Sequence, residues 1–254
     1  GLVYEPDIRT AQIYHNVVQI DFSQMYPTIM VKHNISPETV FCSCCAPQYM
    51  NVERVPEIGF PVCRRRKGIV PLSIAPILKL RQYYKDKKKS APTQQERFRA
   101  AQRSDSLKWL LVTCFGYLGY RNAKFGRLES HESVTAYGRQ KLLLAKQISE
   151  SSNYRLLHAI TDSLFLEPIM NSSNQSANKN VNVQTSPDSL QSLCNRISQA
   201  TDVEMSLEGV YSWVVFLTAR KNDQLPVANR YFGRFYDGSM KVRGILVRRR
   251  DTAT

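Results

Sequence analysis

Residues Leu156–Pro168 have the sequence LLHAITDSLFLEP. It contains two short apolar runs, LLHAI and LFLEP, which meet at Thr161-Asp162-Ser163. Apolar runs of this length, bounded by polar residues, favour strands over helices. The stretch therefore predicts a β-hairpin that holds the carboxylate of Asp162 at its turn. That carboxylate is either a turn former or a metal ligand at a sheet edge, and the stretch read alone favours the turn former.

The chain carries a large excess of positive charge. Its 254 residues include 35 Lys or Arg and 21 Asp or Glu, which gives a formal net charge of +14. Such an excess indicates a polyanionic partner, most often nucleic acid, and a merely basic surface is the alternative. No apolar run approaches the roughly 18–20 residues that span a bilayer, so we expect no membrane partner. The first ten residues show no signal-peptide pattern.

A second carboxylate lies at the end of another predicted strand. The run VVQIDF, residues 17–22, reads as a strand that leads into a polar turn and a helical stretch, where Pro27 suits the first turn. A strand end can present a catalytic group because the next element can leave and open a cleft. Asp21 is therefore a candidate catalytic residue, with a helix N-cap as the alternative.

The residues around Asp21 resemble the first catalytic motif of family B DNA polymerases. Asp21–Ile29, DFSQMYPTI, is similar to the family's D-F-x-S-L-Y-P-S-I, although Gln24 replaces the usual Ser. The resemblance implies that Asp21 binds both catalytic metals, with the backbone carbonyl of Phe22 as a further ligand. The implied nucleotide-binding residues of this motif are Gln24, Met25 and Tyr26, of which the tyrosine stacks under the incoming sugar.

Residues 71–113 predict an αα-hairpin. Two amphipathic helices, Pro71–Ser90 and Thr93–Thr113, are separated by the polar turn Ser90-Ala91-Pro92. Arg81 and Lys85 are one helical turn apart and share a face, and Lys108 lies on the second helix. Three cations that converge between two helices would suit a triphosphate, and a solvated basic face is the alternative.

The second of these helices also resembles a motif of the same family. Lys108–Gly116, KWLLVTCFG, is similar to the fingers motif K-x-x-x-N-S-x-Y-G, with Val112 in place of Asn. The resemblance implies that Lys108, Arg81, Lys85 and Val112 line the nucleotide site. It further implies DNA contacts at Gly116 and Tyr117, which begin a G-Y-x-G-Y segment. Glu132–Arg139, ESVTAYGR, resembles the helix that follows in the family.

The opening hairpin corresponds to motif C of the family, Y-G-D-T-D-S. Aligned on Thr161-Asp162-Ser163, Asp162 becomes the second metal ligand, with Thr161 and Ser163 in supporting roles. Ile160 stands where the family has a further Asp. Catalysis by two Mg²⁺ ions needs at least two carboxylates, which Asp21 and Asp162 would supply, and Mn²⁺ could substitute.

The last third of the chain adds a duplex-contact element. Residues 171–187 are rich in Asn and Ser and predict a flexible loop, and a helix is expected at about 188–200. Asn229–Gly233, NRYFG, resembles the family's K-K-R-Y-x-G, which implies DNA contacts at Arg230, Tyr231 and Gly233. Glu208 matches an acidic position of the family and is given a supporting role. Asp237-Gly238 predicts a hairpin turn.

Four of the six cysteines gather in one region of the sequence. Cys42, Cys44 and Cys45 form a C-x-C-C pattern, and Cys63 follows. This is not a standard zinc spacing, so a disulfide between Cys63 and one of the others, in a protein from a hyperthermophile, is favoured over zinc. Free buried thiols are the third possibility.

The motifs together predict an α+β fold, with an antiparallel palm sheet backed by helices and an inserted helical-hairpin fingers subdomain. The palm comprises residues 1–70 and 123–254 and the fingers residues 71–122, with no exonuclease and no thumb. The expected function is that of a DNA-directed DNA polymerase core that uses dNTPs, primer–template DNA and two Mg²⁺ ions. Other polymerase domains or subunits are possible partners. The expected location is the cytoplasm of an archaeal cell, at the nucleoid, or the nucleus of a eukaryote.

Two other functions compete with this one. Ile160, Val112 and Asn229 depart from the family pattern and favour a degenerate polymerase paralog that binds nucleic acid but catalyses poorly. A plain RNA-binding sheet would need aromatic residues across its central strands, where the sequence offers carboxylates instead.

Overall fold

The computed structural model describes residues 3–4, 13–46, 52–169, 186–219 and 222–245. The chain divides into two compact units, residues 1–23 with 141–254 and residues 24–140. The predicted loop 171–187 lies outside the described residues except for its last two positions. Of these, Ser186 caps a helix and Pro187 begins it.

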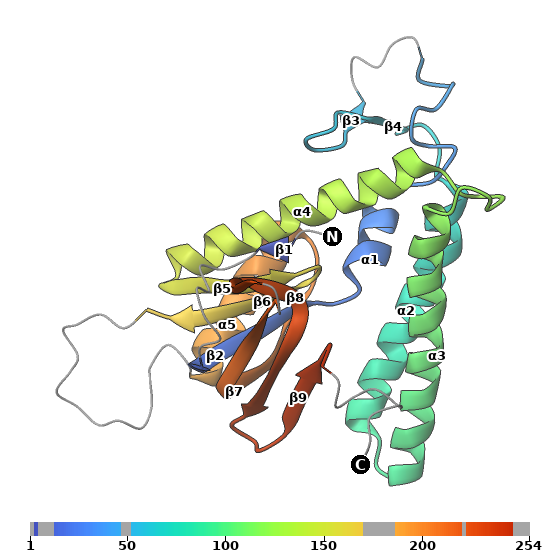
Figure 1. Ribbon diagram of the computed structural model, residues 1–254. Helices are drawn as coiled ribbons and strands as arrows, with labels where there is room; N and C mark the ends of the chain where they lie inside the picture. Colours follow the sequence, from blue (N-terminus) through green and yellow to red (C-terminus); the bar gives the residue numbers. More distant parts are fainter. Residues whose placement is uncertain (1–2, 5–12, 47–51, 170–185, 220–221, 246–254) are drawn as a thin grey trace. The chain divides into compact units, whose positions relative to one another are not determined.

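The first unit is built on a seven-stranded sheet with the order β1-β5-β6-β2-β7-β8-β9 (Figure 1). Every neighbouring pair is antiparallel. The helix α5 (Pro187–Thr201) packs against β7, and α4 (Leu128–Ser151) ends in this unit. The strands are β1 (Val3–Tyr4), β2 (Ile13–Phe22), β5 (Tyr154–Ile160), β6 (Ser163–Pro168), β7 (Met205–Ala219), β8 (Asn222–Phe235) and β9 (Met240–Arg243). The predicted α+β class with an antiparallel sheet is confirmed.

The predicted hairpin at Leu156–Pro168 is present as β5 and β6. Ile160 pairs with Ser163, so only Thr161 and Asp162 form the loop. Two-residue hairpin loops favour positive φ, and Thr161 has a φ of 56°. A β-branched residue in this left-handed region is strained, so the surrounding strands must hold the turn in place.

The alternation of β2 divides its side chains between the two faces of the sheet. Val18, Ile20 and Phe22 point to one face and are at most 1% exposed. On the other face, Val17 belongs to an aromatic cluster centred on Phe165. The ring of Phe165 meets the rings of Tyr211, Phe216 and Tyr231 at centroid distances of 5.1–6.3 Å. Asp21 shares the face that carries this aromatic cluster.

The second unit contains the predicted helical hairpin (Figure 1). The helices α2 (Ile69–Ser90) and α3 (Gln94–Leu118) pack against each other, and α3 continues beyond the predicted end at Thr113. Thr93 caps α3, because its Oγ1 accepts a hydrogen bond from the backbone N–H of Glu96 and donates one to the carboxylate of Glu96. The other elements are α1 (Met25–Lys32), β3 (Glu53–Arg54), β4 (Pro61–Val62) and the first turns of α4.

The helices in the described part of the chain differ from membrane spans in length and composition. None of them combines the length and the apolar composition that a bilayer crossing requires.

The aromatic cluster generates a stability prediction. Phe165→Ala should lower the free energy of unfolding by about 3–5 kcal/mol, because the fully buried ring leaves a cavity among its aromatic partners. Phe98→Ala is the matched control, since that ring is 62% exposed and its loss should change stability by less than about 0.5 kcal/mol. Urea denaturation followed by circular dichroism measures both values. Equal losses in the two variants would contradict the proposed core.

Candidate active site

Asp21 lies on β2, and Asp162 lies in the turn between β5 and β6, at the same end of the sheet. Asp21 pairs with Ser163, and the backbone N–H of Phe22 donates a hydrogen bond to the carbonyl of Asp162 at 2.9 Å. The side chains of both aspartates are partly exposed. The backbones of two residues that are 141 positions apart in the sequence are thereby held next to each other. The structure brings the two predicted metal ligands together.

Ser163 orients the first of these carboxylates. Its Oγ donates a hydrogen bond to Oδ1 of Asp21 at 2.5 Å. Hydrogen bonds of this kind fix the direction in which a ligating carboxylate presents its remaining lone pairs. The Oγ of Ser206 also donates to the backbone carbonyl of Asp21 at 3.3 Å. The supporting role predicted for Ser163 therefore has a defined contact.

Ile160 faces the protein interior. Its side chain is 8% exposed and belongs to the aromatic cluster. The position that precedes the turn therefore offers no ligand to the carboxylate pair.

Glu208 lies on β7 as part of a small polar network. Lys241 on β9 donates hydrogen bonds to Glu208 Oε1 at 2.7 Å and to Gln19 Oε1 at 3.2 Å. The hydroxyl of Tyr211 also donates to Gln19 Oε1 at 2.7 Å, and burial raises the pKa of this tyrosine. Sequence reasoning missed Gln19 and Lys241. The one available signal was that Gln19 stands two positions before Asp21 and so shares its face.

The duplex-contact residues on β8 divide into exposed and buried positions. Arg230 is exposed, whereas Tyr231 is 4% exposed and packs in the aromatic cluster. Burial raises the pKa of Tyr231, and Arg243 opposes this shift. A Cβ added at Gly233 would lie 2.7 Å from the carbonyl of Trp213, so this glycine allows two backbones to approach closely. Of the three predicted DNA contacts on β8, Arg230 is the one whose side chain extends into solvent.

Tyr26 in the second unit is held between α3 and α4. Its ring lies 4.3 Å from that of Phe115, and the Phe115 ring stacks on His131 at 4.5 Å. Burial lowers the pKa of His131, so its imidazole is more readily neutral. A Cβ added at Gly138 would lie 2.9 Å from Cε1 of Tyr26. The glycine of the ESVTAYGR segment therefore leaves the space that Tyr26 occupies.

Gln24 and Met25 occupy the start of α1. Gln24 is the residue before the helix, with a φ of 53°, so the N-cap alternative considered for Asp21 does not apply to this helix. The Oε1 atom of Gln24 is buried and has no hydrogen-bond partner among the described residues. A buried acceptor of this kind is available to a donor on a ligand. Met25 is 2% exposed and packs in the interior.

The three predicted triphosphate cations lie at different levels of the helical hairpin. Arg81 is 9% exposed, and its Nε donates to the carbonyl of Ser104 at 3.3 Å. Burial lowers the pKa of Arg81, although Asp105 partly opposes the shift. Lys85 lies one turn beyond Arg81 on α2, and Lys108 lies one turn beyond Ser104 on the antiparallel α3. The backbone positions of the three cations are thus spread over about 12 Å of helix axis.

The last turns of α3 present an open surface. Val112 and Tyr117 are 52% and 54% exposed, and Lys108 is exposed as well. A Cβ added at Gly116 would meet no atom within 4 Å. These positions therefore leave room for a large ligand.

The carboxylate pair suits a hard divalent cation. Asp21, Asp162 and the carbonyl of Phe22 offer oxygen ligands, which Mg²⁺ prefers, and Mg²⁺ takes few protein ligands because substrate phosphates and waters complete its shell. In the described ranges, the group of three or more clustered ligand side chains is formed by cysteines and not by these aspartates. The fit therefore rests on two carboxylates, the minimum for a two-metal site.

Comparison with known proteins identifies the family. The model of DNA polymerase family B matches residues 1–254. DNA polymerase 2 of Saccharolobus solfataricus is 30% identical over 233 residues, which cover 92% of this chain and 30% of the relative. DNA polymerase 1 of Pyrococcus abyssi is 32% identical over 165 residues, 65% of this chain and 20% of the relative. The chain belongs to DNA polymerase family B.

A solved structure supports the fold. The family B DNA polymerase from the hyperthermophilic archaeon Pyrobaculum calidifontis matches with a TM-score of 0.69 and 24% identity, over 96% of this chain and 29% of that one. The chain spans about 30% of the length of the first of these curated relatives.

The packing of Tyr26 generates a prediction with two helical glycines. Gly138→Ala should lower the free energy of unfolding by about 1–3 kcal/mol, because the new methyl group meets the Tyr26 ring. Gly116→Ala is the control, and it should raise stability by about 0.5–1 kcal/mol, since alanine is the better helix former and the position is open. Chemical denaturation measures both changes. A stabilised Gly138→Ala variant would refute the tight contact.

Proposed function

We propose that this chain is the catalytic core of a DNA-directed DNA polymerase, which transfers a nucleotide from a dNTP to the 3′-hydroxyl of a template-bound primer. The observation that carries the proposal is the juxtaposition of Asp21 and Asp162 at one end of the sheet. Residues 1–70 and 123–254 are assigned to the palm, and residues 71–122 to the fingers. The archaeal relatives suggest that it acts at the nucleoid of an archaeal cell.

Asp21, Asp162 and the Phe22 carbonyl would hold the metal ions. Two bound Mg²⁺ ions, or Mn²⁺ in their place, would supply activation of the primer hydroxyl and neutralisation of the leaving pyrophosphate. The hydroxyl of Ser163 keeps the Asp21 carboxylate in one orientation. The strained turn at Thr161 fixes the position of Asp162 between two strands. Preorganised ligands of this kind lose little freedom when the metals bind.

The second unit would bind the nucleotide. The Tyr26 ring is immobilised by Phe115 and Gly138, which suits a residue that stacks under a sugar and excludes a 2′-hydroxyl. The exposed ammonium group of Lys108 is the cation most available to a triphosphate. Arg81 is buried, so we assign it to the packing of the hairpin and to the local positive field. Lys85 extends that field towards the hairpin tip.

The positive charge of the chain would hold the primer–template duplex. A net charge of +14 favours a polyanion by release of counterions. Arg230 on β8 would contact a phosphate, while Tyr231 and Gly233 support this strand from inside the sheet. Gly116 and Tyr117 on the open surface of α3 would lie along the template.

The carboxylate pair is tested by single-nucleotide incorporation. With enzyme in excess over a labelled primer–template, Asp21→Asn and Asp162→Asn should each reduce the incorporation rate by at least about 10³-fold, because the metals lose half of their carboxylates. Asp188→Asn in the first turn of α5 is the control and should retain the wild-type rate, since this residue is exposed and remote from the pair in sequence. Duplex binding is measured in parallel by fluorescence anisotropy.

The same experiment decides between the enzyme and its main competitor. Ile160 is buried in the aromatic cluster where a family polymerase has a further carboxylate, which is the observation that favours a degenerate paralog. If wild type and Asp162→Asn extend the primer equally little while both bind duplex, the chain is a nucleic-acid-binding protein and not a polymerase.

Lys108 provides a separate test of the nucleotide site. Lys108→Ala should raise the KM for dNTP by about 10–100-fold, because a charge-assisted contact to phosphate contributes about 1.5–3 kcal/mol. Lys89→Ala, at the end of α2, removes an equal charge one residue before the helix ends and should leave the KM unchanged. Steady-state kinetics at fixed ionic strength separates the two variants. A similar rise in both would assign the effect to general charge.

A further inference from the structure

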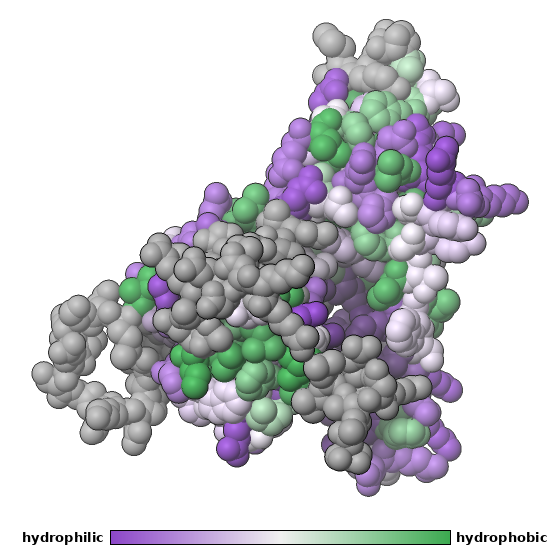
Figure 2. Space-filling model, in the orientation of Figure 1, coloured by the Kyte–Doolittle hydropathy of each residue, from purple (hydrophilic) through white to green (hydrophobic). Residues whose placement is uncertain are grey.

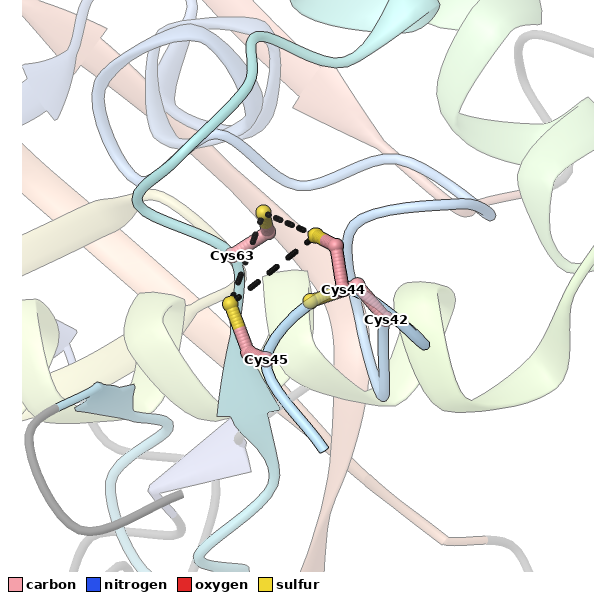
Figure 3. A group of neighbouring side chains, drawn as sticks. All are labelled: Cys42, Cys44, Cys45 and Cys63. Carbon is pink, nitrogen blue, oxygen red and sulfur yellow. Dashed lines mark hydrogen bonds between the residues drawn. The ribbon is translucent and has the colours of Figure 1, made fainter. Parts of the chain in front are cut away.

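Four cysteine sulfur atoms meet at one place in the second unit (Figure 3). The Sγ atoms of Cys42, Cys44, Cys45 and Cys63 all lie within 4.8 Å of one another. Individual Sγ–Sγ distances are 3.4 Å for Cys44–Cys63, 3.9 Å for Cys45–Cys63 and 4.0 Å for Cys44–Cys45. None of these four thiols forms a disulfide in the structure.

These distances match a tetrahedral metal site. A Zn–S bond of about 2.3 Å places two sulfurs of a tetrahedron about 3.8 Å apart, and the three distances lie on either side of that value. A disulfide would need one pair at about 2.05 Å. The spacing C-x-C-C favours a disulfide over zinc, whereas the geometry favours zinc over a disulfide. Adjacent cysteines can share one centre here, because both Cys44 and Cys45 turn their sulfurs towards Cys63 (Figure 3).

The burial of the sulfurs also favours a metal. Cys42, Cys45 and Cys63 are 2–6% exposed and form a buried cluster, against which the partly buried Cys44 and Val52 pack. The neighbouring regular structure consists of two-residue strands, β3 and β4. A core of four thiols buries little apolar surface, whereas four metal–sulfur bonds would hold such a small lobe together.

Hydrogen bonds to the backbone hold the two segments that carry the cysteines next to each other. The N–H of Cys63 donates to the carbonyl of Thr39 at 2.8 Å, and the N–H of Phe41 donates to the carbonyl of Pro61 at 3.0 Å. A guanidinium N–H of Arg65 donates to the carbonyl of Cys44 at 2.9 Å. The two segments that carry the cysteines are thus positioned by contacts other than the sulfurs themselves.

The residues after Cys63 provide the charge that a thiolate site needs. The backbone N–H groups of Arg65 and Arg66 donate hydrogen bonds to the Cys63 sulfur. Four thiolates and one Zn²⁺ carry a net charge of −2, and the run Arg64–Lys67, RRRK, follows directly. Hydrogen bonds and cations around a metal site stabilise such a charge.

We propose that Cys42, Cys44, Cys45 and Cys63 bind one Zn²⁺ ion in a structural site. The ion would join the segment that follows α1 to β4 and to the residues that lead into α2. It has no open position for a substrate, because four protein ligands fill a tetrahedral zinc shell. This site uses none of the residues of the proposed polymerase function, so either one can fail while the other stands.

The first experiment measures the metal content of the purified chain. Wild type, expressed with zinc and desalted, should contain one zinc per chain by inductively coupled plasma mass spectrometry. Cys44→Ser and Cys63→Ser should each retain less than about a tenth of that amount. Cys114→Ser is the matched control, since this cysteine lies on α3 outside the cluster, and it should still hold one zinc.

A second measurement does not depend on whether the variants fold. Metal-free wild type titrated with Co²⁺ should show the intense visible absorption of tetrahedral cobalt and the near-ultraviolet band of thiolate-to-cobalt charge transfer, which saturate at one equivalent. Alkylation of the unfolded, unreduced wild type should label all six cysteines after metal removal. Protein without stoichiometric metal, iron in place of zinc, or a disulfide among these four residues would each overturn the proposal.

Discussion

The pairing of β2 with β6 fixes the positions of the Asp21 and Asp162 backbones at the end of the sheet. Asp21 faces Ser163 across this pair, and the next backbone hydrogen bond, from Phe22 to Asp162, ties the hairpin turn to the neighbouring strand. A slip of one residue would turn Asp21 towards the opposite face, where Val18, Ile20 and Phe22 are buried. The apolar face of β2 therefore enforces the register, and the register places the carboxylates.

Elements with a strong local pattern could be predicted from the sequence. Hydrophobic periodicity and turn-forming residues predict three elements: the hairpin at Thr161–Asp162, the αα-hairpin and the helix after the Asn/Ser-rich stretch. The pairing of Asp21 with the 162–163 turn did not follow from those rules, because a contact between distant strands leaves no local trace. The resemblance to the polymerase motifs supplied that step, and the structure gave it a geometry.

What the sequence could not show depends on side-chain packing. The helical spacing of Arg81 and Lys85 and the family resemblance predicted Arg81 beside a triphosphate, but its guanidinium group lies against the backbone of α3. Tyr231 matched a duplex-contact motif, yet its ring lies in the aromatic cluster. The need for glycine at position 138 follows from the Tyr26 ring, which fills the space that a side chain would occupy. The four cysteines do not follow the standard zinc spacing. That spacing describes pairs of ligands on two regular turns, whereas these cysteines lie in irregular loops.

The burial of Ile160 has a consequence for substitutions at this position. Its side chain is part of the same packed cluster as Phe165 and Tyr231. A single substitution of Ile160 by aspartate would place a carboxylate among aromatic rings, where desolvation favours the neutral acid and opposes metal binding. Gain of a third acidic group would require neighbouring core residues to change first. The packing around Ile160 therefore opposes the addition of a further acidic group at this turn.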